Sequence, residues 1–215
     1  MSEVVLIYGK SGSGKSRSLL YFGEDEIFLI NVCGKRLPIR KKFKYVMVSD
    51  DVNTIAGQIS KMPTKIAVID DAGYLMTNKF MREHSGSKKG AGQFDLYNDI
   101  ADDFWRLIRF CNSLPDDVIV YITMHEDTSD YGETKLRTIG KLLNDKVCIE
   151  GMCTIVLRSI VDNGEYYFLT RSSGSDISKS PEGMLEQKMP NDLKLVDTAI
   201  REYWGITKED DKDGK

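Results

Sequence analysis

The feature that most constrains this chain is an eight-residue segment, residues 9–16, that directly follows the apolar run 4–8. The segment fits the pattern G-x-x-x-x-G-K-[ST], in which glycines let successive backbone N–H groups converge on phosphate oxygens. Such a phosphate-binding loop needs a buried strand before it and a helix after it, and residues 4–8 and 16–22 suit these roles. A chance turn of glycine and serine is the alternative, but it does not account for a full match placed after a strand. The sequence therefore predicts a site for a nucleoside triphosphate.

Two positions of this loop have specific expected roles. Lys15 would reach the β- and γ-phosphates, and the hydroxyl of Ser16 would ligate Mg²⁺. The expected cofactors are therefore ATP and Mg²⁺. The expected nucleotide-binding residues are Gly9, Lys10, Ser11, Gly12, Ser13, Gly14, Lys15, Ser16 and Arg17.

The length and charge of the chain limit what surrounds this site. Its 215 residues suffice for one α/β domain, which we expect to span 1–207, followed by a disordered tail, 208–215, with no apolar residue. The formal net charge of −3 gives no global argument for binding nucleic acid, so any such argument must be local. No signal segment or membrane span is evident, and we expect a cytoplasmic protein without a membrane partner.

The cysteines and histidines do not form a zinc-binding pattern. No C-x-x-C pair occurs and the two histidines lie far apart, so we expect the thiols to be buried and reduced. These residues are Cys33, Cys111, Cys148, Cys153, His84 and His125.

Apolar runs alternate with helical patterns along the chain, which predicts an α/β fold of three layers with a mostly parallel central sheet. The expected strands are residues 4–8, 27–31, 45–48, 66–70, 118–123, 154–161 and 166–170. The expected helices are residues 16–22, 52–62, 72–83, 94–113 and 193–204. The pair Asn163-Gly164 predicts an antiparallel C-terminal hairpin, and Asn191 is the expected N-cap of the last helix. Two polar segments, 84–93 and 126–138, are expected to be loops, either functional ones near the nucleotide or ordinary surface connections.

The expected strand at residues 66–70 ends in two carboxylates, Asp70 and Asp71. A carboxylate at the end of such a strand holds the Mg²⁺ shell of a bound nucleotide, and a neighbouring acid can polarise the attacking water. We therefore assign Asp70 to the metal and Asp71 to the water. An acidic cap for the following helix is the alternative, but the phosphate-binding loop upstream favours the catalytic interpretation.

The next strand, residues 118–123, is followed by further polar side chains. In P-loop ATPases of the additional-strand class, this strand lies between the metal-binding strand and the one that carries the phosphate-binding loop. We expect Thr123 and His125 to act as sensors of the γ-phosphate, with His125 able to donate a hydrogen bond to phosphate or water. A histidine placed there incidentally is the alternative, and Glu126 is a rival to Asp71 as the water-activating acid.

Both nucleotide motifs and several later stretches are similar to segments of a known protein family. They are residues 6–16, 69–76, 138–143, 150–152, 178–184 and 190–193. With them the chain resembles the small ATP-binding proteins of bacteriophages with a RecA-like P-loop core, which include single-strand-annealing, recombination-associated ATPases. The first two stretches are shared by many ATPases and the later ones are more specific. The resemblance extends to about residue 204, and it implies an oligomeric ATPase core that acts in phage DNA recombination, replication or repair.

The chain departs from two groups of relatives in its water-activating acid. AAA+ proteins place a glutamate directly after the metal aspartate, where this chain has the shorter Asp71. RecA-like proteins take the glutamate from the end of an earlier strand, where this chain has Ser49, Asp50 and Asp51. Both departures fit slow hydrolysis, or ATP used as a binding switch. The leading hypothesis is therefore an ATPase, and the second is an ATP-gated DNA-binding or assembly module. A nucleotide kinase is disfavoured because no R-x-x-x-R lid cluster occurs.

Residues 34–45 contain six cations, with Phe43 and Tyr45 next to the last of them. Such cations neutralise phosphates and aromatic rings stack on bases, so we expect single-stranded DNA as a partner, bound in a salt-sensitive way without base specificity. A solvated connection between two strands is the alternative. Together with a lysine pair further along, the candidate contacts are Lys35, Arg36, Arg40, Lys41, Lys42, Lys88 and Lys89.

Rapid P-loop ATPases often receive a cation across a subunit interface to neutralise transition-state charge. The sequence does not indicate which cation plays this role. We favour Lys141 because it lies in residues 138–143, one of the stretches that resemble the phage family. The candidates are Arg137, Lys141, Arg158 and Arg171.

Overall fold

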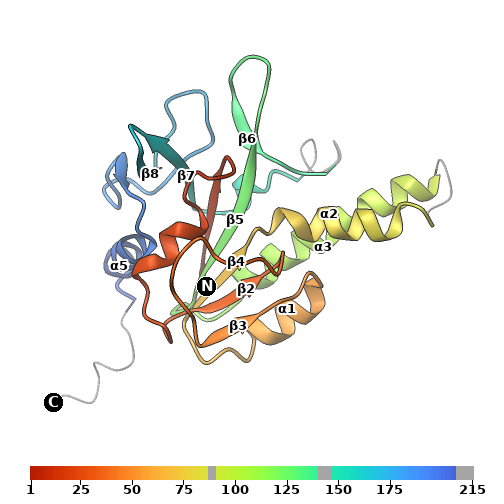
Figure 1. The fold of residues 1–215 in the computed structure, drawn as a ribbon, viewed down its shortest axis with the longest axis horizontal. Coiled ribbons are helices and arrows are strands. Elements are labelled where there is room, and N and C mark those ends of the chain that lie inside the picture. Colours follow the sequence, from red (N-terminus) through yellow and green to blue (C-terminus); the bar gives the residue numbers. More distant parts are fainter. Residues whose placement is uncertain (87–90, 140–146, 207–215) are drawn as a thin grey trace.

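The computed structural model describes residues 1–86, 91–139 and 147–206 (Figure 1). Over this part of the chain one sheet has the strand order β3-β2-β4-β5-β1-β7-β8-β9, and β6 pairs with β5. The strands are β1 (Glu3–Gly9), β2 (Phe28–Asn31), β3 (Tyr45–Met47), β4 (Ile66–Asp70), β5 (Ile119–Thr128), β6 (Thr134–Leu136), β7 (Ile155–Asp162), β8 (Glu165–Leu169) and β9 (Lys188–Pro190). The helices are η1 (Ser16–Tyr21), α1 (Val52–Ile59), α2 (Gly73–Glu83), α3 (Ala91–Asn112), η2 (Glu150–Met152) and α5 (Leu193–Trp204).

The centre of the sheet is parallel and buried on both faces. Strand β5 lies between β1 and β4, and its Tyr121 is in register with Val5 of β1 and with Val68 of β4. Strands covered on both faces are nearly continuous apolar runs, which is why these segments were recognisable in the sequence. The expected insertion of this strand between the other two is confirmed, and it brings three carboxyl ends to one edge of the sheet.

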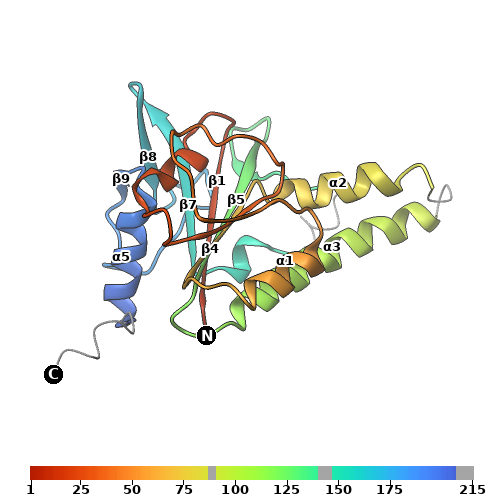
Figure 2. The same ribbon diagram turned by 60° about the horizontal axis from the view of Figure 1, so that its bottom comes forward.

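Each face of the sheet has its own apolar core. Alternate residues of β1 point to opposite faces, so Leu6 packs with α1, α2 and α3, whereas Ile7 packs with η1 and α5. Figure 2 shows α5 and the three helices α1, α2 and α3 on opposite sides of the strands. The three-layer α/β fold is therefore confirmed.

The C-terminal hairpin forms as the sequence predicts. Strands β7 and β8 are antiparallel, and the turn between them contains Asn163 at φ 51° and Gly164 at φ 84°. Two successive residues with positive φ match the right-handed twist of a tight hairpin. Strand β9 then pairs antiparallel with β8.

Three local expectations were wrong. The segment after the phosphate-binding loop is a short 3₁₀ helix, η1, rather than an α-helix. The cap of α5 is Asp192, whose carboxylate accepts hydrogen bonds from two backbone N–H groups, while the amide of Asn191 is buried and donates to Ser159. The polar segment 126–138 is not a simple loop, because β5 continues to Thr128 and pairs with β6, and the resulting hairpin extends beyond the sheet (Figure 1).

The cysteines differ from one another in exposure. Cys111 and Cys153 are buried, and desolvation raises the pKa of each thiol to about 12. Cys148 is exposed and Cys33 is partly exposed, so the expectation of four buried thiols was wrong. Within the described ranges, no group of three or more histidine, cysteine, aspartate or glutamate side chains could hold a metal ion by itself.

No helix in the described part of the chain is long and apolar enough to cross a membrane. The expected disordered tail, 208–215, lies outside the described residues.

Glu3, at the start of β1, makes the stability of the fold depend on pH. Desolvation raises the pKa of this carboxyl to about 7 from an ordinary value of 4.5, although a hydrogen bond with Thr154 opposes the shift. Between these values the folded chain holds a proton that the unfolded chain has lost, so the free energy of unfolding falls as the pH rises.

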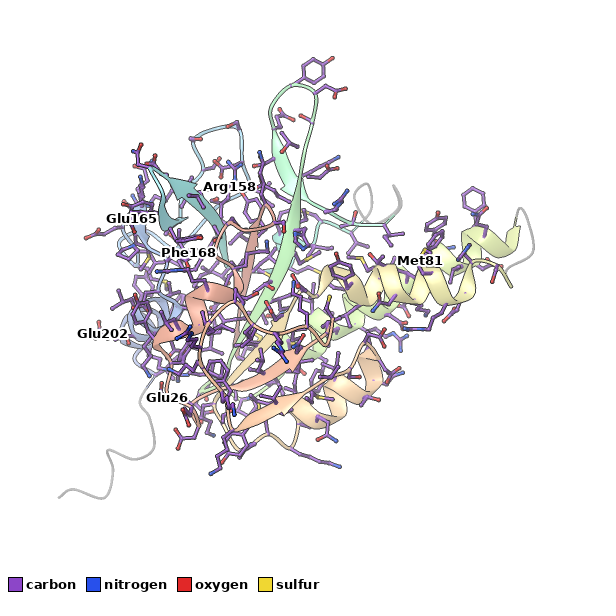
Figure 3. The ribbon with its side chains drawn as sticks, viewed as in Figure 1. Glu26, Met81, Arg158, Glu165, Phe168 and Glu202 are labelled. Atoms are coloured by element: carbon purple, nitrogen blue, oxygen red, sulfur yellow. The ribbon has the colours of Figure 1, made fainter. Side chains whose placement is uncertain are left out.

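We expect Glu3→Gln to raise the free energy of unfolding by about 1 kcal/mol at pH 8, after allowance for solvent screening, and to change it little at pH 4.5. Urea denaturation at both pH values measures this, with Glu202→Gln on the exposed face of α5 as the control (Figure 3). Equal pH profiles for the wild-type chain and Glu3→Gln would contradict it.

Candidate nucleotide-binding site

The phosphate-binding loop depends on two glycines in the left-handed backbone region, Gly12 at φ 80° and Gly14 at φ 104°. A Cβ atom at Gly14 would also lie only 2.7 Å from the ring of Tyr166. No acceptor among the described residues takes a hydrogen bond from the N–H groups of Gly12, Gly14 or Lys15. These three donors are therefore available to phosphate oxygens.

Lys15 lies buried at the loop. Its ammonium group donates hydrogen bonds to the carbonyl oxygens of Gly9 at 2.9 Å and Lys10 at 2.8 Å. Desolvation lowers the pKa of Lys15, and the nearby charges of Asp71 and Asp70 oppose this shift. The ammonium group is therefore held within the phosphate-binding loop.

Asp70, the last residue of β4, joins the loop to the sheet. The hydroxyl of Ser16 donates to both of its oxygens at 2.9 Å, and the hydroxyl of Thr123 donates to Oδ1 at 2.8 Å. Desolvation raises the pKa of Asp70, as does the charge of Asp71, while the two hydroxyl groups lower it. The structure therefore brings together the two residues expected to hold the metal, Ser16 and Asp70.

Thr123 lies beneath these carboxylates rather than at the open pocket. Its side chain is fully buried, and its Oγ1 atom accepts a hydrogen bond of 2.7 Å from the backbone N–H of Asp71. Because the hydroxyl both donates and accepts within the protein, the expectation that it contacts the γ-phosphate directly was wrong. Thr123 is a positioning residue for Asp70 and Asp71.

The side chain of Asp71 is buried between two nitrogen groups. Its Oδ1 atom lies 3.5 Å from Nε2 of His125, and its Oδ2 atom forms an ion pair with the ammonium of Lys35. The backbone of Asp71 is left-handed, at φ 61°, a conformation that costs about 1 kcal/mol in a residue with a Cβ. Desolvation lowers the pKa of His125, with a further contribution from the charge of Lys15, so His125 is neutral at pH 7.

These groups line one pocket of about 300 Å³ at the carboxyl ends of β1, β4 and β5. Its lining includes Asp71, His125 and Lys35. It also includes Arg17, whose guanidinium stacks over the ring of Tyr166 at 4.7 Å from its centre. The phosphate-binding loop thus shares one pocket with an ionic group and with a cation–aromatic pair.

Glu126 lies elsewhere, although it follows His125 directly. Successive residues of a strand point to opposite sides, and Glu126 lines a second hollow together with Ser13 and Arg158. Arg158 reaches it from β7 (Figure 3) and donates two hydrogen bonds to the carboxylate, at 2.9 and 3.2 Å. Glu126 therefore lines a different hollow from Asp71, although both hollows include Ser11 and Gly12 of the loop. Arg158, a candidate to act across a subunit interface, is engaged within its own chain.

The acids expected from an earlier strand are also remote. Strand β3 is at the edge of the sheet, and the neighbour of β4 is β2. Asp50 accepts hydrogen bonds from Asn78 and Arg82, and Asp51 caps α1. Lys141 lies outside the described residues, as do Lys88 and Lys89.

The basic segment, residues 34–45, is less open than its sequence indicates. Phe43 is buried in the core beside η1, so it cannot stack on bases. The ammonium of Lys41 donates to the backbone carbonyl groups of Leu20 and Phe22, and Lys35 belongs to the nucleotide pocket. Arg36 is exposed but also lines the nucleotide pocket, and Arg40, Lys42 and Lys44 are exposed as well.

Comparison with known families agrees with this geometry. The family model described as AAA domain matches residues 2–181, most of the chain. The chain belongs to the AAA domain family. The family assignment gives a P-loop, nucleotide-binding ATPase fold, and it spans both nucleotide motifs. A search of the curated proteins found no match.

The pocket of this AAA domain has the donor set that a magnesium–triphosphate complex requires. The loop offers unpaired N–H donors and the charge of Lys15 for phosphate oxygens. Ser16 and Asp70 offer adjoining hydroxyl and carboxylate oxygens, which are the hard ligands that Mg²⁺ prefers. The residues present therefore fit both ATP and Mg²⁺.

Four pocket residues of the AAA domain were missed as nucleotide ligands in the sequence. Lys35 and Arg36 were grouped with the basic segment, Pro38 had no assigned role, and Tyr166 was assigned only to a strand. Lys35 follows the strand next to β4, so a correct strand order would have identified it. No local pattern indicates Tyr166, which reaches the loop only because β7 and β8 fold beside it.

Replacing Thr123 with valine tests the network around Asp70. Thr123→Val keeps the shape but removes the hydroxyl, so we expect the free energy of unfolding to fall by about 1–3 kcal/mol and Mg²⁺-dependent nucleotide binding to weaken. Chemical denaturation and calorimetric titration measure the two effects. Thr123→Ser keeps the hydroxyl and should retain nucleotide binding. If valine and serine have equal effects on binding, the hydroxyl does not position Asp70.

Proposed function

We propose that this AAA domain is an ATP- and Mg²⁺-dependent ATPase. The observation that carries this proposal is the pocket in which the loop, Ser16 and Asp71 meet, with the buried carboxylate of Asp70 bonded to Ser16. Bound Mg²⁺ would supply positive charge that neutralises the phosphates as the terminal bond breaks. Ser16 and Asp70 would hold this ion.

Asp71 is our candidate for the acid that orients and deprotonates the attacking water. Its rivals are remote from the pocket or engaged elsewhere, since Glu126 is paired with Arg158 and Asp50 with Arg82. His125, neutral and 3.5 Å from the carboxylate, can orient water or donate to a phosphate oxygen. The side chain of aspartate is shorter than the glutamate of faster relatives, so we expect slow turnover.

A second function, an ATP-gated module with little hydrolysis, has support from one observation. The carboxylate of Asp71 is paired with Lys35, so one of its oxygens is engaged by an ammonium group rather than free to accept a hydrogen bond from water. Turnover near zero with tight ATP binding would favour this function over the ATPase.

We further propose that the protein binds single-stranded DNA and forms a homo-oligomer in phage recombination, replication or repair. Support comes from the resemblance to recombination-associated phage ATPases and from the exposed cations Arg36, Arg40 and Lys42 of the basic segment. Cations on an exposed connection contact the phosphate backbone, so this binding would be insensitive to base sequence.

Two substitutions separate nucleotide binding from hydrolysis. Lys15→Ala removes the buried ammonium, so we expect ATP affinity to fall by about 100-fold or more. Asp71→Asn keeps the shape of the pocket, so we expect ATP to bind while kcat falls by about 100-fold or more. Titration calorimetry and phosphate release measure these effects. Wild-type affinity in Lys15→Ala would overturn the site assignment, and wild-type turnover in Asp71→Asn would remove Asp71 from catalysis.

The basic segment can be tested without disturbing the core. Reversing the charges of Arg40 and Lys42 should weaken binding of a single-stranded oligonucleotide and flatten its dependence on salt, because fewer counterions are released. Fluorescence anisotropy at several salt concentrations measures this. Lys61→Glu, after the end of α1, is the matched control. Unchanged affinity and salt slope in the double variant would show that the segment is only a solvated connection.

A further inference from the structure

Lys35 lines the nucleotide pocket, and hydrogen bonds of the preceding turn hold its backbone in place. It follows β2, the neighbour of β4, and Asn31 of β2 is in register with Asp70. The buried amide of Asn31 donates a hydrogen bond of 2.6 Å to the carbonyl oxygen of Lys35. Gly34, at φ 63°, closes the turn through its N–H bond to the carbonyl oxygen of Asn31. The backbone of Lys35 is thus fixed beside the end of the metal-binding strand.

The partner of Lys35 is fixed as well. The backbone N–H of Asp71 is bonded to Thr123, and its side chain is 3% exposed, whereas that of Lys35 is 52% exposed. An ammonium group has three N–H donors, so the ion pair with Asp71 leaves others that can face the pocket. Desolvation lowers the pKa of Lys35, but the hydrogen bond and charge of Asp71 outweigh it and raise the pKa, so the group stays cationic at neutral pH.

The neighbours of Lys35 indicate which phosphate it can reach. Lys35 pairs with Asp71, and His125 lies 3.5 Å from the same carboxylate, so the three side chains form one group in the pocket. The attacking water lies next to the terminal phosphate, and Asp71 is the acid proposed to orient that water. A terminal phosphate placed for this reaction therefore faces the ammonium group of Lys35.

We propose that Lys35 contacts the terminal phosphate and makes the pocket selective for nucleoside triphosphates over diphosphates. This inference rests on the proposed ATP site and deepens it. Lys15 lies at the loop and serves both nucleotides, whereas Lys35 gains a ligand only when the third phosphate is present. Asp71 positions the ammonium for this contact. Because Lys35 is the first cation of the basic segment, the same contact makes the position of that segment depend on whether ATP or ADP is bound.

Calorimetric titration of Lys35→Met with ADP and with a non-hydrolysable ATP analogue, both with Mg²⁺, tests the proposal. We expect the affinity for the analogue to fall by about tenfold or more, because a charge-assisted hydrogen bond is lost, and the affinity for ADP to change by less than about threefold. Lys35→Arg should keep much of the preference for the triphosphate. Lys61→Met, the same change at an exposed lysine, should alter neither affinity.

A purely structural role for Lys35 predicts a different pattern. If Lys35 only neutralises the buried carboxylate, Lys35→Met should weaken both nucleotides equally, and adding Asp71→Asn should restore both affinities together with the melting temperature. That result would overturn the proposal. Under the proposal, the double variant recovers thermal stability but not the preference for the triphosphate. A wild-type chain that binds neither nucleotide would overturn the ATP site itself, whereas equal losses in Lys35→Met would overturn only the role of Lys35.

Discussion

The hydrogen bonds that converge on the carboxylate of Asp70 hold the site together. One comes from Ser16, which follows β1, and another from Thr123 of β5, while Asp70 itself ends β4. These bonds form only because the three strands are parallel neighbours whose carboxyl ends meet at one edge. Thr123 also holds the backbone of Asp71, so one buried hydroxyl sets the positions of both acids. The geometry of the pocket thus follows directly from the order and register of the sheet.

Charge balance is the second requirement of this site. Two adjacent buried carboxylates repel each other and are costly to desolvate, which is why the pKa of Asp70 is raised. The structure compensates Asp70 with hydroxyl donors and Asp71 with the ammonium of Lys35 and the ring of His125. The groups that offset the free-energy cost of burying these two carboxylates are therefore also the donors and acceptors that a magnesium–triphosphate complex needs.

Strand β5 separates two environments at the loop. His125 faces the nucleotide pocket, and Glu126 faces the other hollow, where Arg158 neutralises it. A shift of one residue in register would exchange these side chains and place a glutamate beside the nucleotide. His125 pairs with Gly9 of β1 and Glu126 pairs with Leu136 of β6, so both neighbouring strands share in this register. The choice between Asp71 and Glu126 therefore depends on the fold rather than on the order of residues.

The sequence by itself determined the phosphate-binding loop, the strand that ends at Asp70, the three-layer fold and the final hairpin, because each depends on local patterns of glycines and apolar residues. It did not determine that Thr123 would be buried beneath Asp70, that Phe43 would enter the core or that Asp50 would lie at a remote edge. It also grouped Lys35 with cations that face solvent. These outcomes depend on which strands become neighbours, and strand pairing is a long-range property that local patterns do not encode. Only the tertiary structure brought Lys35 to Asp71, because β2 rather than β3 packs against β4.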